Sequence, residues 1–167
     1  MLSSIAILIL LLLPHSLFAH IGEWQNSKFS KVRILSAIKG DALFVGVEFR
    51  VQDGWYIYSA DPGDIGLPTQ IDLSKSKHIE ASLVHWPAHE LVTVWTGNSR
   101  MQSKVYRGNI LIPVRGSMAN KDLPAAIEVT VRYGVCAEIC IPCEISLTSM
   151  PDDDEEAYEL ISAWFDK

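Results

Sequence analysis

Residues 28–51 read KFSKVRILSAIKGDALFVGVEFRV, and the stretch contains two runs with the composition of β-strands. The first run, KFSKVRILSAI, alternates weakly and is rich in β-branched side chains. The second run, ALFVGVEFRV, alternates with Phe44, Val47 and Phe49 among its apolar positions. The KGD at residues 39–41 is a typical turn sequence. Because a period of two indicates strands, the stretch predicts a β-hairpin.

The strand pattern continues along most of the chain. Short β-rich runs, separated by Gly, Pro and Asp, recur roughly every ten residues up to residue 149, as in sandwich proteins. Between them, DPGDIGLP at 61–68 and WTGNSRMQ at 95–102 have the composition of loops. About seven or eight such strands predict an all-β fold, an antiparallel β-sandwich that is immunoglobulin-like in the broad sense.

The two ends of the chain depart from this pattern. Residues 1–19 contain an apolar run that is short for a membrane span and ends near the small Ala19, which predicts a cleaved signal peptide. A short uncleaved anchor is the alternative. Residues 20–150 are then expected to form the sandwich, and residues 151–167 an amphipathic helix docked on it. In this last segment an acidic start precedes apolar side chains at helical spacing, namely Ala157, Leu160, Ile161, Trp164 and Phe165.

Length, charge and motifs narrow the classes of function. The 167 residues, of which 49% are hydrophobic, suffice for one ordinary core. A net charge of −6, without a run of Lys or Arg, makes nucleic acid an unexpected partner. No serine-hydrolase, zinc-protease or phosphate-loop motif is present. Export would place the chain in an oxidising compartment, where disulfides form and persist.

All three cysteines lie in residues 133–144, YGVCAEICIPCE. Four steps along an extended strand span about 13 Å, whereas disulfides need Cα atoms roughly 4.4–6.8 Å apart. Cys136 and Cys140 can therefore pair only if the chain reverses at residues 137–139, and Pro142 disfavours a helix there. We expect a strand, a tight reversal and a second strand, with the pair at the tip. A bridge across so small a loop adds little stability, which favours a redox role over a structural one.

The third thiol, Cys143, leaves several uses open. In an extended segment it points away from Cys140, so we expect it to face the core as a small hydrophobe. Alternative pairing and metal ligation are the other roles. Thiolates are suitable ligands for Cu(I), so an exported copper-binding protein that uses all three cysteines is one alternative. Our own expectation is that the protein has no metal site and no cofactor. A sandwich whose disulfide merely pins a hairpin, a non-catalytic binding module, is another.

Three segments, in this order, resemble one known family: GWYIYSADPGDIGLPTQIDL at 54–73, YRGNILIPV at 106–114 and VRYGVCAEICIPCEISL at 131–147. Over about residues 28–149 the chain resembles the N-terminal periplasmic domain of the DsbD and ScsB thiol:disulfide reductases. It is most similar to the ScsB branch, whose name stands for suppressor of copper sensitivity. The resemblance implies an immunoglobulin-like sandwich that takes electrons from a membrane partner and passes them to periplasmic disulfide proteins by thiol–disulfide exchange.

The resemblance also implies roles for single residues. Cys136 and Cys140 match the redox pair, and Cys140 resembles the cysteine that attacks the partner's disulfide. VWTGNS resembles the aromatic cap loop that shields the pair, which would make Trp95 the cap. Tyr56 and Tyr58 resemble aromatic residues near the site. We expect a periplasmic component of a thiol:disulfide oxidoreductase system, whose membrane electron donor is encoded separately.

Overall fold

The hairpin expected from residues 28–51 forms the centre of one sheet. In the computed structural model, which describes residues 21–167, strands β2 (Ser30–Lys39) and β3 (Ala42–Val51) pair antiparallel. Their register runs without a break to the last pair, Lys39 with Ala42, so the turn consists of residues 40–41. The expected signal peptide lies outside the described residues.

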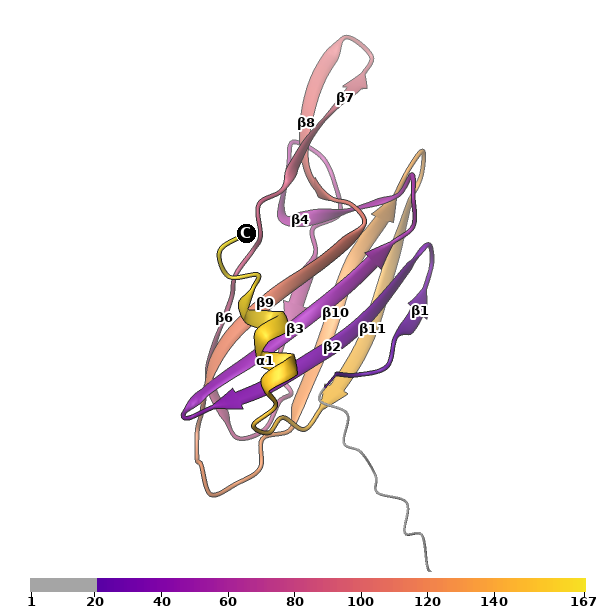
Figure 1. Ribbon diagram of the computed structural model, residues 1–167. Helices are drawn as coiled ribbons and strands as arrows, with labels where there is room; N and C mark the ends of the chain where they lie inside the picture. Colours follow the sequence, from indigo (N-terminus) through magenta and orange to yellow (C-terminus); the bar gives the residue numbers. More distant parts are fainter. Residues whose placement is uncertain (1–20) are drawn as a thin grey trace, which may run out of the picture.

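Two antiparallel sheets face each other, which confirms the expected immunoglobulin-like sandwich (Figure 1). The other strands are β1 (Gln25–Ser27), β4 (Tyr56–Gly63), β5 (Gln70–Asp72), β6 (Ile79–Val84), β7 (Glu90–Thr96), β8 (Ser99–Tyr106), β9 (Asn109–Met118), β10 (Ile127–Cys136) and β11 (Cys140–Ser149). The first sheet has the order β1-β2-β3-β9-β6, and the second has the order β11-β10-β4-β8-β7, with β5 beside β10. This second sheet carries both paired cysteines.

The main core lies between the sheets and is built from alternate side chains of each strand. On β3, Val47 and Phe49 are fully buried in this core. Phe44 lies an odd number of residues from both Val47 and Phe49. Because side chains alternate along a strand, it points to the opposite, outer face of the sheet. Phe44 is nevertheless buried, because a second apolar layer covers that face.

That second layer is the expected C-terminal helix, α1 (Glu155–Ser162), which packs on the outer face of the first sheet (Figure 1). Ile161 is fully buried among Leu35, Phe44 and Leu111. Gly46 of β3 makes room for this contact: a Cβ atom there would lie 3.0 Å from Cγ1 of Ile161. A glycine in the middle of a strand therefore lets the helix approach the sheet closely.

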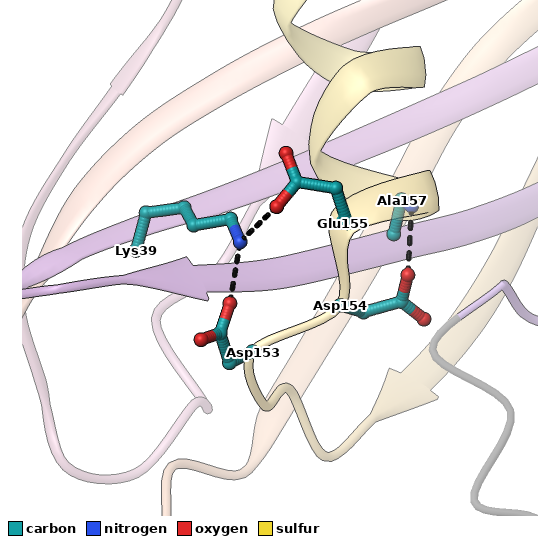
Figure 2. A network of polar contacts seen from close by, with 5 residues as sticks. All are labelled: Lys39, Asp153, Asp154, Glu155 and Ala157. Atoms are coloured by element: carbon teal, nitrogen blue, oxygen red, sulfur yellow. Dashed lines mark hydrogen bonds and ion pairs between the residues drawn. The ribbon is translucent and has the colours of Figure 1, made fainter.

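The acidic residues before the helix fix its start (Figure 2). The Asp154 carboxylate accepts a hydrogen bond of 2.9 Å from the backbone N–H of Ala157, as an N-cap does. Lys39, at the end of β2, reaches Asp153 at 2.5 Å and Glu155 at 2.6 Å. Both carboxylates raise the pKa of the Lys39 ammonium above its usual value. The helix is thus anchored to the sheet at its first turn.

The segment WTGNSRMQ is not a loop, which corrects the sequence interpretation. β7 and β8 pair as far as Thr96 with Ser99, so the turn is confined to residues 97–98. The β7–β8 hairpin projects beyond the rest of the sandwich (Figure 1). Its turn is TGNS, whose Gly97 takes the positive φ of +61° that such a tight turn requires. Among residues 21–167, no helix has the length and hydropathy of a membrane span.

Candidate functional site

The predicted chain reversal brings two of the cysteines together. Cys136 ends β10, Cys140 begins β11, and the two are direct partners in the ladder. Residues 137–139 form the connecting loop, in which the Ala137 N–H donates to the Ile139 carbonyl at 2.9 Å. The Cα atoms of the cysteines are 4.1 Å apart and a disulfide joins their sulfurs. The strand, tight reversal and strand expected from the sequence are confirmed.

The two bonded cysteines differ sharply in exposure. Cys136 is 0% exposed. Its strand, β10, is an interior strand between β11 and β4, and Tyr56 of β4 is its direct partner in the ladder. Cys140 is exposed, because β11 is the edge strand of the same sheet. A reactant from solution therefore meets Cys140 first, while Cys136 is reached only through it.

Two tyrosines of β4 pack beside the disulfide. Tyr56 and Tyr58 alternate along the strand and so share one face, with their rings edge to face at 5.4 Å between centroids. The Oη atom of Tyr58 lies 3.8 Å from Sγ of Cys140. Because a disulfide sulfur carries no hydrogen, the tyrosine hydroxyl is the group that can donate in this contact. Burial, together with a hydrogen bond to Tyr56, raises the pKa of Tyr58, so its hydroxyl stays protonated.

The charged groups around the cysteine pair are arranged in ion pairs. The Arg107 guanidinium lies 4.9 Å from the centre of the Tyr56 ring and pairs with Glu90 at 3.4 Å. On the two strands below the disulfide, Arg132 pairs with Glu144 at 2.7 Å. Each of these two guanidinium groups therefore has a carboxylate partner.

The segment DPGDIGLPT covers the site, a role that the turn composition alone does not indicate. Gly66 packs against the Tyr58 ring, where a Cβ atom would lie 2.4 Å from two ring carbons, and its φ is +146°. Leu67 lies over Gly134, whose Cβ would be 2.7 Å from the leucine Cβ. Thr69 donates its hydroxyl to the Tyr58 carbonyl. Gly66 and Gly134 lack a side chain where Tyr58 and Leu67 approach closely, so these two glycines are the signal of this packing in the sequence.

Trp95 occupies a different position from the tyrosines. It lies near the tip of the β7–β8 hairpin, opposite Arg100 in the ladder, and 66% of its surface is exposed. At the base of the hairpin, Val92 packs against the buried cluster of Tyr58, Val105 and Cys136. The structure therefore brings Tyr56 and Tyr58 to the disulfide, whereas Trp95 is placed outside that cluster, on an element whose base contacts the site.

Cys143 is a free thiol on the opposite face of β11 from Cys140. It is half-buried and packs against the main core, opposite Tyr133 in the ladder, and its Sγ lies 3.7 Å from the Ile141 carbonyl oxygen. The three sulfurs therefore do not converge on one point. Within residues 21–167, no group of three or more His, Cys, Asp or Glu side chains has an arrangement suited to a metal ion.

Apolar surface surrounds the exposed cysteine. Ile139, in the loop between the cysteines, is 64% exposed, and Leu67 is 40% exposed. Leu67 lines a pocket of about 370 Å³ together with Pro142, the Arg132–Glu144 pair and the free Cys143, among others. A protein that reached Cys140 would meet the exposed Ile139, which directly precedes it in the chain.

Comparisons with known proteins agree with this fold. The family model described as "Thiol:disulfide interchange protein DsbD, N-terminal" matches residues 27–151. The N-terminal periplasmic domain of ScsB from Proteus mirabilis superposes with a TM-score of 0.69 at 17% identity, over 87% of this chain and 59% of that one. The chain thus spans less than two thirds of that structure.

Two structures from Neisseria meningitidis also match. The reduced N-terminal domain of DsbD has a TM-score of 0.42 at 21% identity, over 74% of this chain and 86% of that one. The complex between the DsbD and PilB N-terminal domains has a TM-score of 0.35 at 18% identity, over 70% and 80%. No curated protein sequence matches the chain.

Proposed function

This chain belongs to the family of the N-terminal domain of the thiol:disulfide interchange protein DsbD, and from that premise we propose that it passes reducing equivalents to other disulfide proteins through Cys136 and Cys140. The observation that carries the proposal is the unequal exposure of the bonded sulfurs. An exposed Cys140 joined to a fully buried Cys136 supports stepwise thiol–disulfide exchange that begins at Cys140, because the rate of exchange depends on access to the sulfur.

The proposed exchange has two steps. In the reduced protein, the Cys140 thiolate attacks one sulfur of a partner disulfide; a mixed disulfide forms, and the partner's other sulfur leaves as a thiolate that takes up a proton. The buried Cys136, once deprotonated, then attacks Sγ of Cys140 and releases the partner with two thiols. Two electrons have moved from the cysteine pair to the partner, and the pair is left as the disulfide that the structure shows.

The chain's place in a cell follows from the same premise. The related ScsB domain is periplasmic, and we propose the same compartment here, reached by means of the signal peptide in residues 1–19. The partners would be periplasmic thiol–disulfide proteins. Because each turnover leaves the pair oxidised, an electron donor must reduce it again, and a separate membrane protein is the proposed source.

Thiol-specific trapping tests the proposal. In the reduced Cys136→Ser variant, Cys140 remains, and with oxidised glutathione it should form a mixed disulfide detectable by mass spectrometry. In Cys140→Ser, the buried Cys136 should react on the order of tenfold more slowly, because exchange rates follow access to the thiolate. Cys143→Ala is the matched control and should leave the reaction of the pair unchanged.

A redox titration of the wild-type chain completes the test. The pair should equilibrate with glutathione at a measurable potential. A disulfide that stays oxidised at every accessible potential would contradict the proposal and favour a non-catalytic module, in which the bridge only pins the β10–β11 hairpin. Faster reaction at Cys136 than at Cys140 would contradict the assigned order of attack.

A further inference from the structure

The reactivity of Cys140 needs a physical source that the ion pairs do not supply. Thiol attack requires the thiolate, and an ordinary cysteine is mostly protonated at neutral pH. Arg107 is held by Glu90 and Arg132 by Glu144, while Glu138 adds a negative charge in the connecting loop. Because each of these cations already has a carboxylate partner, a neutral hydrogen-bond donor becomes the relevant group for an anion at Cys140.

We propose that Tyr58 is a positioning residue that donates its hydroxyl hydrogen bond to the Cys140 thiolate and thereby holds this sulfur in its reactive form. The contact already exists in the disulfide form, with 3.8 Å between Oη and Sγ. Reduction places negative charge on this sulfur, and a hydrogen bond to an ionised acceptor is shorter and stronger than one to a neutral acceptor. The inference rests on the proposed function, since it explains the attack by Cys140.

The Tyr58 hydroxyl lies between two acceptors, Oη of Tyr56 and Sγ of Cys140. Because the hydrogen bond with Tyr56 raises the pKa of Tyr58, Tyr58 is the donor to Tyr56 in the disulfide form. Its single hydrogen turns to Sγ of Cys140 once this sulfur is a thiolate, because an ionised acceptor makes the stronger hydrogen bond.

The structure fixes the Tyr58 hydroxyl in this position. The tyrosine is only 4% exposed, Gly66 packs against its ring, and Thr69 holds its carbonyl. In such low-dielectric surroundings a hydrogen bond is electrostatically stronger than in water. The raised pKa of Tyr58 keeps the phenol protonated across the range in which a thiol titrates, so the donor is present whenever the thiolate forms.

The test is a pH profile of a single sulfur. In a full-length Cys136→Ser, Cys143→Ala parent, only Cys140 reacts with a dipyridyl disulfide; a mixed disulfide forms and one pyridinethione leaves. Adding Tyr58→Phe should raise the kinetic pKa of Cys140 by about one unit. Because a more basic thiolate is also more nucleophilic, the rate should fall about threefold at neutral pH and rise about threefold on the alkaline plateau.

Two variants separate this role from packing. Tyr106→Phe removes another buried hydroxyl, one that donates to the Pro87 carbonyl at 2.9 Å, and should leave the profile unchanged. Tyr56→Phe keeps the Tyr58 donor and removes the acceptor that competes with Cys140, and should therefore shift the profile in the opposite direction by a smaller amount. It also serves as the second variant should Tyr58→Phe fail to fold.

The outcomes are distinguishable. A crossover of the two profiles, with the Tyr58→Phe rate below the parent at neutral pH and above it on the plateau, supports the inference. A reactive parent whose profile neither tyrosine variant shifts overturns the inference and leaves the proposed function standing. A parent whose Cys140 does not react at any pH overturns both.

Discussion

Gly66 illustrates how a single backbone position controls the candidate site. Its Cα lies against the Tyr58 ring so closely that a Cβ would approach ring carbons to 2.4 Å, and its φ of +146° is one that L side chains rarely adopt. The Tyr58 ring in turn covers the buried side of the disulfide. The position of the ring, and with it the contact to Cys140, therefore depends on the absence of one methyl group.

We expect Gly66→Ala to lower the free energy of unfolding by about 2–4 kcal/mol, since overpacking and a disfavoured backbone conformation both contribute. It should also weaken the contact of Tyr58 with Cys140. Chemical denaturation measures the first effect. Gly97→Ala is the matched control: φ is +61° but nothing lies within 4 Å of the added Cβ, so only the backbone cost of about 1 kcal/mol applies. Equal losses for both variants would contradict the steric argument.

Single residues were predictable from the sequence to the extent that local geometry determines them. The chain reversal between Cys136 and Cys140 was predictable as the condition for their pairing, because an extended strand cannot bring them together. The cover formed by Gly66 was not predictable in this way, because a Gly- and Pro-rich segment indicates a turn and says nothing about what the turn packs against. The contact of Tyr58 with Cys140 likewise depends on the pairing of β4 with β10, which joins segments distant in the sequence.

At the scale of elements, α1 depends on the sheet that it covers. A helix from Glu155 to Ser162 is too short to be stable alone in water. It is held by Ile161 in the space above Gly46, by the Asp154 cap and by the Lys39 bridge to the two flanking carboxylates (Figure 2). Burial and backbone capping are expected to dominate, because exposed ion pairs contribute little.

This ranking can be tested at the first turn of α1. Asp154→Ala removes the acceptor of the Ala157 N–H and should cost about 1 kcal/mol of stability. Asp153→Ala removes one exposed carboxylate of the Lys39 bridge, leaves Glu155 in place, and should cost less, about 0–0.5 kcal/mol. Urea denaturation of the two variants gives the comparison. A larger loss for Asp153→Ala would show that the ion pair, and not the cap, fixes the helix.

The elements show where sequence patterns succeed and where they fail. The β2–β3 hairpin and α1 were predictable because each has its own period and its own turn or cap. The β7–β8 hairpin was missed, because Ser, Arg and Gln near its turn have the composition of a loop while the ladder continues to Thr96. The face of Phe44 was not predictable, because β3 is covered on both faces and its apolar residues do not alternate cleanly.

At the scale of the molecule, the helix that packs on the sandwich and the disulfide lie on different sheets. The helix covers the outer face of the first sheet, whereas the disulfide and its tyrosines belong to the second sheet, at the end where the β10–β11 loop lies (Figure 1). The exposed Ile139, at 64%, lies beside Cys140 at the end of the second sheet, whereas the exposed Leu160 lies on the helix that covers the first sheet. Changes at the two surfaces should therefore have separable effects on exchange with a protein partner.

Ile139→Glu tests whether the apolar surface beside Cys140 receives a partner. A charge there would have to be desolvated on docking, so we expect exchange with an oxidised thioredoxin-fold protein to slow by about tenfold. Exchange with hydroxyethyl disulfide, which is small and uncharged, should change little, since it needs no docking surface. Stopped-flow measurement of both reactions, starting from the reduced protein, gives the two rates.

Leu160→Glu provides the matched control, because Leu160 is an exposed leucine of α1, 42% accessible, on the first sheet's side of the molecule. It adds the same charge to the whole protein and should leave both rates unchanged, which separates a local docking effect from long-range repulsion. If Ile139→Glu slows both reagents equally, the substitution acts on the reactivity of Cys140 itself. If neither variant slows the protein reaction, the partner approaches Cys140 from another side, and the surface around Ile139 has no part in recognition.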